Sequence, residues 1–320
     1  TMRGSRHVPD GESKRIWQRL GVTFGSDSNA QTTPTGTTYA LDLPQATQAS
    51  LTESMKILAG MMAEPNINAG SVDAERAVVL AEKRESDGPQ SRISDANRLH
   101  FFAGQPLAEH APIGTVDTLK AATAAKMEAF HQRWYRPENT VIAISGDIDP
   151  AIAEQLIKDN FGNWTAPGKG AAIPDFGAPD PKAPATRVFV EPGVPVSLTM
   201  AWLRPWTPHA DTIVYNQDKL TDMLALQIVS RRLEQAARTG GSFLQASVEQ
   251  QDVSRSADGT FLSIIPSNDD WQKALHDVRA IVAPGFRSEQ VLLGMSALKQ
   301  LEFTQRAGTL VLRQHVTDRP

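Results

Sequence analysis

Apolar residues recur along the chain with two periods, and each period predicts one kind of element. Spacings of three and four residues predict helices, whereas alternation predicts strands. The predicted helices of the first half cover 12–20, 46–63, 71–97, a segment from Thr115 or Asp117 to about 135, and a segment beginning at Asp149 and Pro150. The predicted strands are a hairpin of 22–33 and 35–44, with one packed and one open face, and the apolar run TVIAISGD at 140–147.

A second region with the same mixture of elements follows a change in composition. From residue 165 to 186 Pro and Gly are so frequent that neither helix nor strand is expected. Beyond it we expect strands at 187–192, 196–205, 243–251 and 259–267, a long helix at 213–238, and two helices that close the chain. The pattern predicts an α+β fold of two successive domains, each a mostly antiparallel sheet packed against helices: 1–166, a linker at 167–186, and 187–320.

Composition narrows the class of protein. The 320 residues are 40% hydrophobic and 21% charged with a formal charge of −4, which is typical of a globular protein and argues against nucleic acid as a partner. The absence of cysteine excludes disulfides, thiolate zinc sites and cysteine nucleophiles. No apolar run is long enough to span a membrane. The opening TMRGSRHVPDGE is neither a signal peptide nor a usual start, so we expect residues to precede Thr1.

The stretch SVDAERAVVLAEKRES, residues 71–86, places two glutamates on one stripe of a predicted helix. Glu75 and Glu82 are seven residues apart, and Val78 and Val79 lie between them on that stripe. The pattern therefore predicts that both carboxylates lie on the packed side, where each needs a cation, hydrogen-bond donors or a proton. Taken alone, it favours salt bridges to arginines of neighbouring helices over a metal site.

Other candidate chemistry is sparse. None of the seven histidines forms a His-x-x-x-His or His-x-x-Glu-His pair, and no nucleophile elbow, phosphate loop or dinucleotide fingerprint occurs. Asn29 is typical of a turn or bulge. His131, with Trp134 and Tyr135, is typical of a helix end that packs its rings on the core.

Several segments together resemble a known family. The runs RGSRHVPDGE, LGVTFGSDSNAQTTPTGTTYALDLP, SVDAERAVVLAEKRE and PIGTVDTLKAATAAKMEAFHQRWYRPENTVIAISGDIDP, in this order and spacing, resemble the pitrilysin/insulinase-like zinc peptidases, family M16. Residues 187–320 resemble the family's following domain by their pattern and by the region SRRLEQAARTGGSFLQAS. The resemblance implies the family's two-domain α+β fold and a zinc-dependent endopeptidase that cuts extended peptides inside a closed chamber.

The resemblance also implies roles for particular residues. Through ERAVVLAE, Glu82 corresponds to the family's zinc-binding glutamate and Glu75 to the carboxylate that supports the site. Asn29 and Ala30 correspond to an edge strand that holds the peptide substrate. The family's His-x-x-Glu-His helix, with two zinc ligands and the general base, is expected upstream of Thr1. The intact site would hold one zinc ion, and the 320 residues alone are predicted to be inactive.

Two alternatives to a peptidase stay open. One is a non-catalytic M16-like subunit that serves as a scaffold or as the peptide-binding half of a heterodimer. The other is an unrelated α+β binding protein whose Glu75 and Glu82 form salt bridges. In the peptidase interpretation the chamber closes with a second M16-like half or partner subunit, and bacterial relatives of this size favour the periplasm over the cytoplasm.

Overall fold

The computed structural model describes residues 3–180, 186–282, 301–306 and 309–314. The chain divides into two compact units, each of which is described by itself. The first unit comprises residues 1–87 and 110–175, and the second comprises 88–109 and 176–320. The chain passes from the first unit to the second after Asp175, inside the predicted linker. Residues 88–109, which the sequence pattern assigned to the first domain, belong to the second unit. The predicted domain boundaries stay a prediction.

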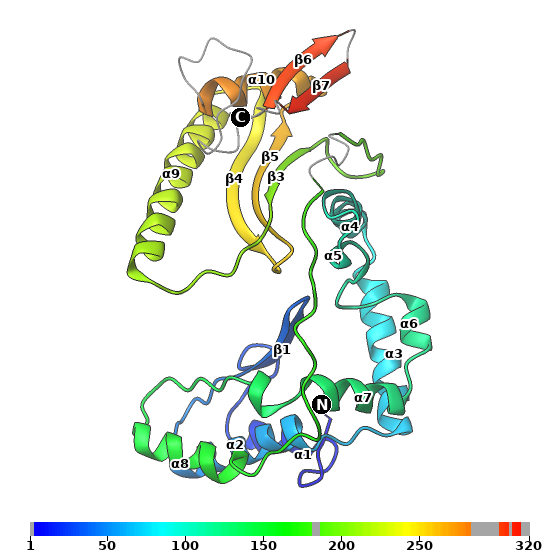
Figure 1. Cartoon of the computed structure of the whole chain (residues 1–320), viewed down its shortest axis with the longest axis vertical. Helices are drawn as coiled ribbons and strands as arrows, with labels where there is room; N and C mark the ends of the chain where they lie inside the picture. Colours follow the sequence, from blue (N-terminus) through cyan, green and yellow to red (C-terminus); the bar gives the residue numbers. More distant parts are fainter. Residues whose placement is uncertain (1–2, 181–185, 283–300, 307–308, 315–320) are drawn as a thin grey trace. The chain divides into compact units, whose positions relative to one another are not determined.

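The first unit consists of helices and a small antiparallel hairpin (Figure 1). Its elements are α1 (Glu12–Arg19), β1 (Ser28–Thr33), β2 (Gly36–Leu41), α2 (Gln48–Ala63), α3 (Ala69–Glu85), α6 (Val116–Lys120), α7 (Ala124–Trp134), a 3₁₀ turn (Pro137–Asn139) and α8 (Pro150–Phe161). Its core joins α1, α2 and the chain around them through Val8, Trp17, Val22, Ile57 and Met61. The predicted helices at 12–20 and 46–63 and the predicted hairpin are thus confirmed.

Local sequence sets where several of these helices begin. Thr47, Asn68, Thr115, Thr123 and Asp149 each accept a hydrogen bond from a backbone N–H of the first turn. Such caps satisfy donors that have no partner inside the helix. Of the two caps proposed for the helix after 114, Thr115 is the one used, and Asp149 followed by Pro150 at the first helical position is confirmed.

The second unit is a three-stranded antiparallel sheet with helices packed on it. Its elements are α4 (Pro89–Phe101), α5 (Pro106–Glu109), β3 (Leu198–Arg204), α9 (Ile213–Arg238), β4 (Phe243–Val253), β5 (Ala257–Pro266), α10 (Trp271–Val282), β6 (Leu301–Arg306) and β7 (Thr309–Gln314). The strand order is β3-β5-β4, and in the part of the chain that the structure describes β6 and β7 form a separate pair. Leu233 of α9 and Val278 of α10, both fully buried, pack with Phe243, Leu262 and Ile264 of the sheet. The predicted α+β class is confirmed.

Two predicted helices are each broken in the structure. The helix predicted at 71–97 is α3 followed by α4, because Gly88 is extended and Pro89 starts α4, and proline cannot continue a helix from the preceding turn. The helix predicted from Thr115 to about 135 is α6 followed by α7, since Thr123 is extended and caps a new helix. The Gly88-Pro89 pair is a break signal in the sequence, which apolar spacing taken by itself does not include.

Two predicted strands are wrong. Residues 140–147 and 187–192 pair with none of the strands that the structure describes, and Val141 and Val190 are 92% and 89% exposed. A β-strand exists only with a hydrogen-bonded neighbour, which a single-segment pattern does not supply. Of the two helices predicted to close the chain, α10 is present, residues 283–300 lie outside the described residues, and strands β6 and β7 are the last elements that the structure describes.

Candidate functional site

Helix α3 carries both candidate carboxylates, and its residues fall into two stripes. Val72, Arg76, Val79 and Lys83 are half-buried, whereas Glu75, Val78 and Glu82 are exposed. Both stripes follow the helical spacing of three and four residues. Glu75 and Glu82 therefore share one side of the helix as predicted, but that side is the open one.

The prediction that Glu75 and Glu82 lie on the packed side is wrong, and Arg76 explains why. Its guanidinium, on the half-buried stripe, donates hydrogen bonds to the carbonyl oxygens of Leu119, at 3.0 Å, and of Ala122. These carbonyls lie at the end of α6, where cations are favoured. The aliphatic stem of an arginine can be buried while its head group is satisfied in this way. Val78 is left 53% exposed between the two glutamates.

Glu75 is bound by an arginine from the start of the chain. The Arg3 guanidinium donates a hydrogen bond to Glu75 through Nε, and its Nη1 lies 3.2 Å from Oδ2 of Asp10. The hydrogen bond to Glu75 is the main reason why the pKa of Arg3 is raised above its ordinary value. Half of the Glu75 side chain is exposed, so this pair is a surface interaction. The salt-bridge interpretation therefore applies to Glu75, although its arginine comes from a loop and not from a helix.

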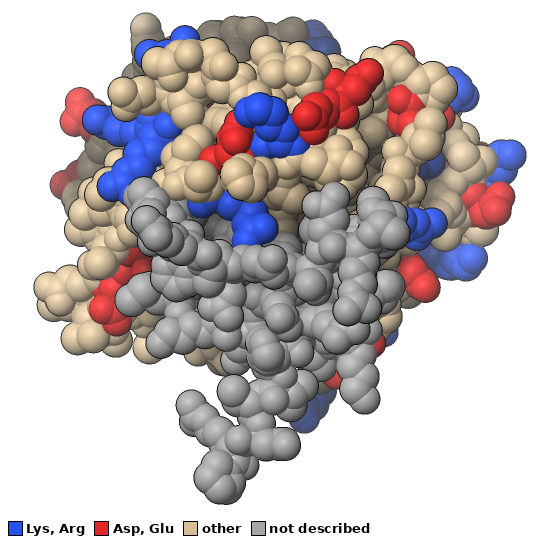
Figure 2. Space-filling model, turned by 90° about the horizontal axis from the view of Figure 1, so that it is seen from above, with Lys and Arg blue, Asp and Glu red and all other residues tan. Residues whose placement is uncertain are grey.

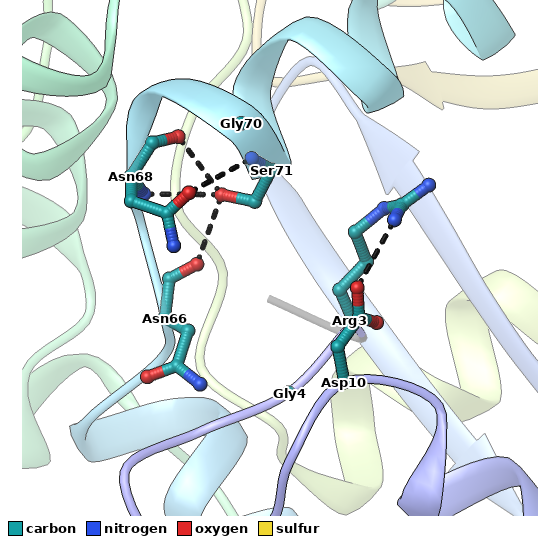
Figure 3. Close-up of a pocket in the computed structure, with 7 residues that line it drawn as sticks. All are labelled: Arg3, Gly4, Asp10, Asn66, Asn68, Gly70 and Ser71. Carbon is teal, nitrogen blue, oxygen red and sulfur yellow. Dashed lines mark hydrogen bonds and ion pairs between the residues drawn. The ribbon is translucent and has the colours of Figure 1, made fainter.

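A polar pocket of about 270 Å³ lies beside this pair at the beginning of α3 (Figure 3). It is lined by Arg3, Gly4, Asp10, Asn66, Asn68, Gly70 and Ser71. Asn68 and Ser71 form a reciprocal capping box that uses the donors of the first helical turn. Because Arg3 faces Asp10 and Glu75, the positive charge in the pocket is already compensated.

Glu82 differs from Glu75 because it has no partner among the residues that the structure describes. No hydrogen bond or ion pair of the described residues involves its exposed carboxylate. Within the same residues no three side chains of His, Asp or Glu are grouped closely enough to hold a metal ion. A catalytic zinc ion needs three protein ligands, so this part of the chain does not by itself fit zinc. It offers one free carboxylate.

The proposed substrate residues lie on the hairpin. In β1, Asn29 is opposite Ala40 and Ala30 is opposite Tyr39. Asn29 is exposed, and its Oδ1 accepts a hydrogen bond of 2.8 Å from the N–H of Ala30. The sheet consists of β1 and β2 alone in the described part of the chain, so the outer edge of β1 is open. An open edge is the feature that strand addition requires.

A series of hydrogen bonds and one ring-stacking contact anchors the same hairpin. The hydroxyl oxygens of Tyr39 and Tyr135 are 2.8 Å apart, and the Tyr135 ring stacks on His131 with centroids separated by 4.6 Å. Nε2 of His131 lies 2.8 Å from the carbonyl oxygen of Met62 in α2. Burial lowers the pKa of His131, and the Met62 carbonyl partly offsets this. The prediction that His131 packs at a helix end is confirmed.

The structure thus joins some of the predicted site residues and separates others. Glu75 and Glu82 share a helix face, and Asn29 and Ala30 share a strand, but no hydrogen bond or ion pair in the described residues links the two pairs. Sequence reasoning missed Arg3, which is 72 residues from its partner Glu75. Only its basic character in RGSRHVPDGE could have drawn attention to it.

The surface carries charge of both signs. On the face shown in Figure 2, Lys and Arg side chains alternate with Asp and Glu side chains across the described residues. This mixture agrees with the formal net charge of −4. None of the helices in the described segments combines the length and the apolar character needed to cross a bilayer.

Comparison with known proteins gives one family match that covers half of the chain. Residues 121–284 match the family described as "Peptidase M16 inactive domain". The matched segment begins directly after α6 of the first unit and ends after α10 of the second. It does not include α3 or the hairpin.

Relatives and solved structures extend the likeness. The "Probable zinc protease PqqL" of Escherichia coli is 33% identical over 163 residues, which are 51% of this chain and 18% of that protein. The crystal structure of the periplasmic protease PqqL from Escherichia coli superposes with a TM-score of 0.72 at 24% identity, over 88% of this chain and 31% of that one. The structure of the first half of PqqL gives a TM-score of 0.70 at 24% identity and covers 88% and 60% of the two chains. The sequence match thus covers less than a fifth of that curated relative, and the superposition covers less than a third of the PqqL chain.

Proposed function

Because the chain belongs to the M16 peptidase family, we propose that it forms part of a zinc-dependent endopeptidase in which Glu82 is the third protein ligand of the metal. One observation carries this proposal: the Glu82 carboxylate is exposed and unpaired among the described residues, on the same helical stripe as Glu75. A carboxylate with a salt-bridge partner would have to give up that partner before binding a cation, and Glu82 has no such partner in the described part of the chain.

The remaining ligands are proposed to come from outside the 320 residues. A His-x-x-Glu-His segment before Thr1 would add two imidazoles and a general base to Glu82, leaving one coordination position open. When bound in such a site, zinc polarises the scissile carbonyl and lowers the pKa of its water. In this proposal Glu82 supplies the third ligand and Glu75 supports it.

Glu75 is the proposed support. Its carboxylate is oriented by the Arg3 guanidinium, which Asp10 orients in turn. Carboxylates that lie just outside the ligands of a metal fix the orientation and basicity of those ligands. Because Arg3 pairs with Glu75, the negative charge of Glu75 repels the Glu82 carboxylate less than it would without that pair.

The proposed substrate site is the open edge of β1 at Asn29 and Ala30. An extended peptide would add there as a further strand and gain main-chain hydrogen bonds. The N–H of Ala30 is now bound to the Asn29 side chain, so peptide binding would replace that hydrogen bond by one to the substrate. The site therefore suits an unfolded segment and not a folded protein surface.

Replacement of Glu82 by Gln tests the ligand assignment. In the protein expressed with the residues its gene encodes before Thr1, Glu82→Gln is expected to reduce bound zinc from about one ion per chain to nearly none and to abolish peptide cleavage. Zinc is measured by mass spectrometry of the purified protein. Glu85→Gln, three residues along the same helix, is the matched control. Stoichiometric zinc in Glu82→Gln would remove the assignment.

The second candidate function is a non-catalytic M16-like subunit. It is favoured by the description of the matched family, which is that of an inactive domain. The codons immediately before Thr1 distinguish the two candidates. A His-x-x-Glu-His motif there supports the peptidase, whereas its absence supports a scaffold or peptide-binding subunit.

The whole protein is proposed to act in the periplasm together with a second M16-like half. The periplasm is proposed because a neighbour of the same fold is described as periplasmic. The second half is proposed because the chain superposes on the first half of PqqL. Cell fractionation followed by immunodetection would test the compartment.

A further inference from the structure

We propose that Tyr135 is a positioning residue for peptide binding, because its hydroxyl fixes the hairpin whose β1 edge receives the substrate. This inference rests on the proposed function. It adds Tyr135, the residue that directly follows α7 and lies 96 positions from its partner Tyr39. Tyr135 is not proposed to touch the reacting groups.

The first step is the register of the hairpin. Tyr39 of β2 lies directly opposite Ala30 of β1. Cross-strand neighbours in an antiparallel pair are rigidly related, so the position of Tyr39 determines that of Ala30. The Tyr39 hydroxyl is 2.8 Å from the hydroxyl of Tyr135, in a partly buried environment. The anchor therefore acts at the strand position where the peptide is proposed to bind.

The second step is what holds Tyr135. Its ring stacks on His131, one helical turn earlier, at an interplanar angle of 20°, and its N–H donates to the His131 carbonyl oxygen at 2.8 Å. His131 is buried, and its Nε2 must donate to the Met62 carbonyl because a carbonyl oxygen only accepts. Met62 packs against the core of the first unit. The anchor is thus connected to the buried core of that unit.

The third step is the exposure of the outer part of the hairpin. From Gln31 to Thr38 every hairpin residue is exposed. A two-stranded hairpin is marginally stable alone, so its position depends on a few contacts near Ala30. Holding the edge in one position reduces the ordering that peptide binding would otherwise require.

Tyr135→Phe tests this inference, since it removes one hydroxyl and keeps the ring that stacks on His131. Amide hydrogen exchange of the 320-residue chain is expected to become faster in residues 28–41 of the variant and to stay unchanged in α2. Tyr215→Phe is the matched control, because Tyr215 stacks on His209 with the same angle of 20° and a centroid distance of 4.8 Å in the second unit. Unchanged exchange at 28–41 overturns the proposal.

Peptide affinity gives the second measurement. The probe is a fluorescein-labelled, unstructured peptide of alternating apolar and polar residues, followed by fluorescence polarisation. Tyr135→Phe and Tyr39→Phe are each expected to raise Kd about five-fold, the equivalent of one hydrogen bond. The double variant is expected to match either single variant, because both remove the same bond. Where cleavage is measurable, KM rises and kcat is retained.

The outcomes separate this inference from the zinc assignment. Faster exchange with weaker peptide binding supports it even if Glu82→Gln retains zinc. Additive effects of the two tyrosine variants, or a wild-type chain that binds no peptide, overturn it even if Glu82 proves to be a ligand.

Discussion

His131 shows how one residue combines a packing role with a charge state. It is 8% exposed, stacks on Tyr135 and donates to the Met62 carbonyl. Burial disfavours the charged imidazolium and lowers the pKa of His131. A histidine with a lowered pKa in the folded state binds fewer protons than it does in the unfolded state. Its contribution to stability is therefore complete above the unfolded pKa and declines as the pH falls below it.

We predict that the free energy of unfolding decreases as the pH falls from about 7.5 to about 5.5, across the ordinary pKa of histidine, and decreases less in His131→Gln. Burial also lowers the pKa of His100, so part of the slope remains in the variant. Urea unfolding at a series of pH values measures the effect. Equal slopes in wild type and His131→Gln would contradict the prediction.

Helix α9 shows the same contrast between faces at the scale of an element. The predicted helix at 213–238 has the bounds of α9, because its apolar period is uninterrupted and Thr212 caps it. Leu233 is fully buried against the sheet, whereas Leu224 is 52% exposed on the same helix. Both are leucines at helical positions, and only their contacts differ.

We predict that Leu233→Ala lowers the free energy of unfolding of the second unit by about 2–5 kcal/mol through the cavity it creates. Leu224→Ala should change it by no more than about 0.5 kcal/mol. Denaturant unfolding with hydrogen exchange in β4 and β5 as a local readout measures both. Similar losses for the two variants would show that the exposed side of α9 is covered in solution.

At the scale of the whole molecule, membership of the M16 family is confirmed. Zinc-dependent catalysis is a proposal. The residues described hold one unpaired candidate ligand and no cluster of three. Affinity for zinc depends on the number and geometry of ligands, so a single carboxylate binds it weakly.

We therefore predict that the 320-residue chain alone binds no stoichiometric zinc and does not cleave peptides. Isothermal titration with zinc and a fluorogenic peptide assay with and without chelator measure this. A chain that cleaves no peptide but still binds the labelled peptide would agree with the proposed role of β1. Chelator-sensitive cleavage by the chain alone would contradict the prediction.

The sequence by itself determined the features that depend on neighbouring residues. Helix caps at Thr115 and Asp149, the bounds of α9 and the hairpin of β1 and β2 follow from interactions within a few positions. The α+β class follows from the order of such elements. The stripe shared by Glu75 and Glu82 was predictable for the same reason.

Only the tertiary structure decided which side of α3 is open, that Arg3 binds Glu75, and that Tyr39 meets Tyr135. It also left 140–147 without a strand partner among the described residues. The physical reason is the same in each case. Helical periodicity groups residues onto a face, but burial, ion pairing and strand pairing depend on a second segment that lies far away in the sequence.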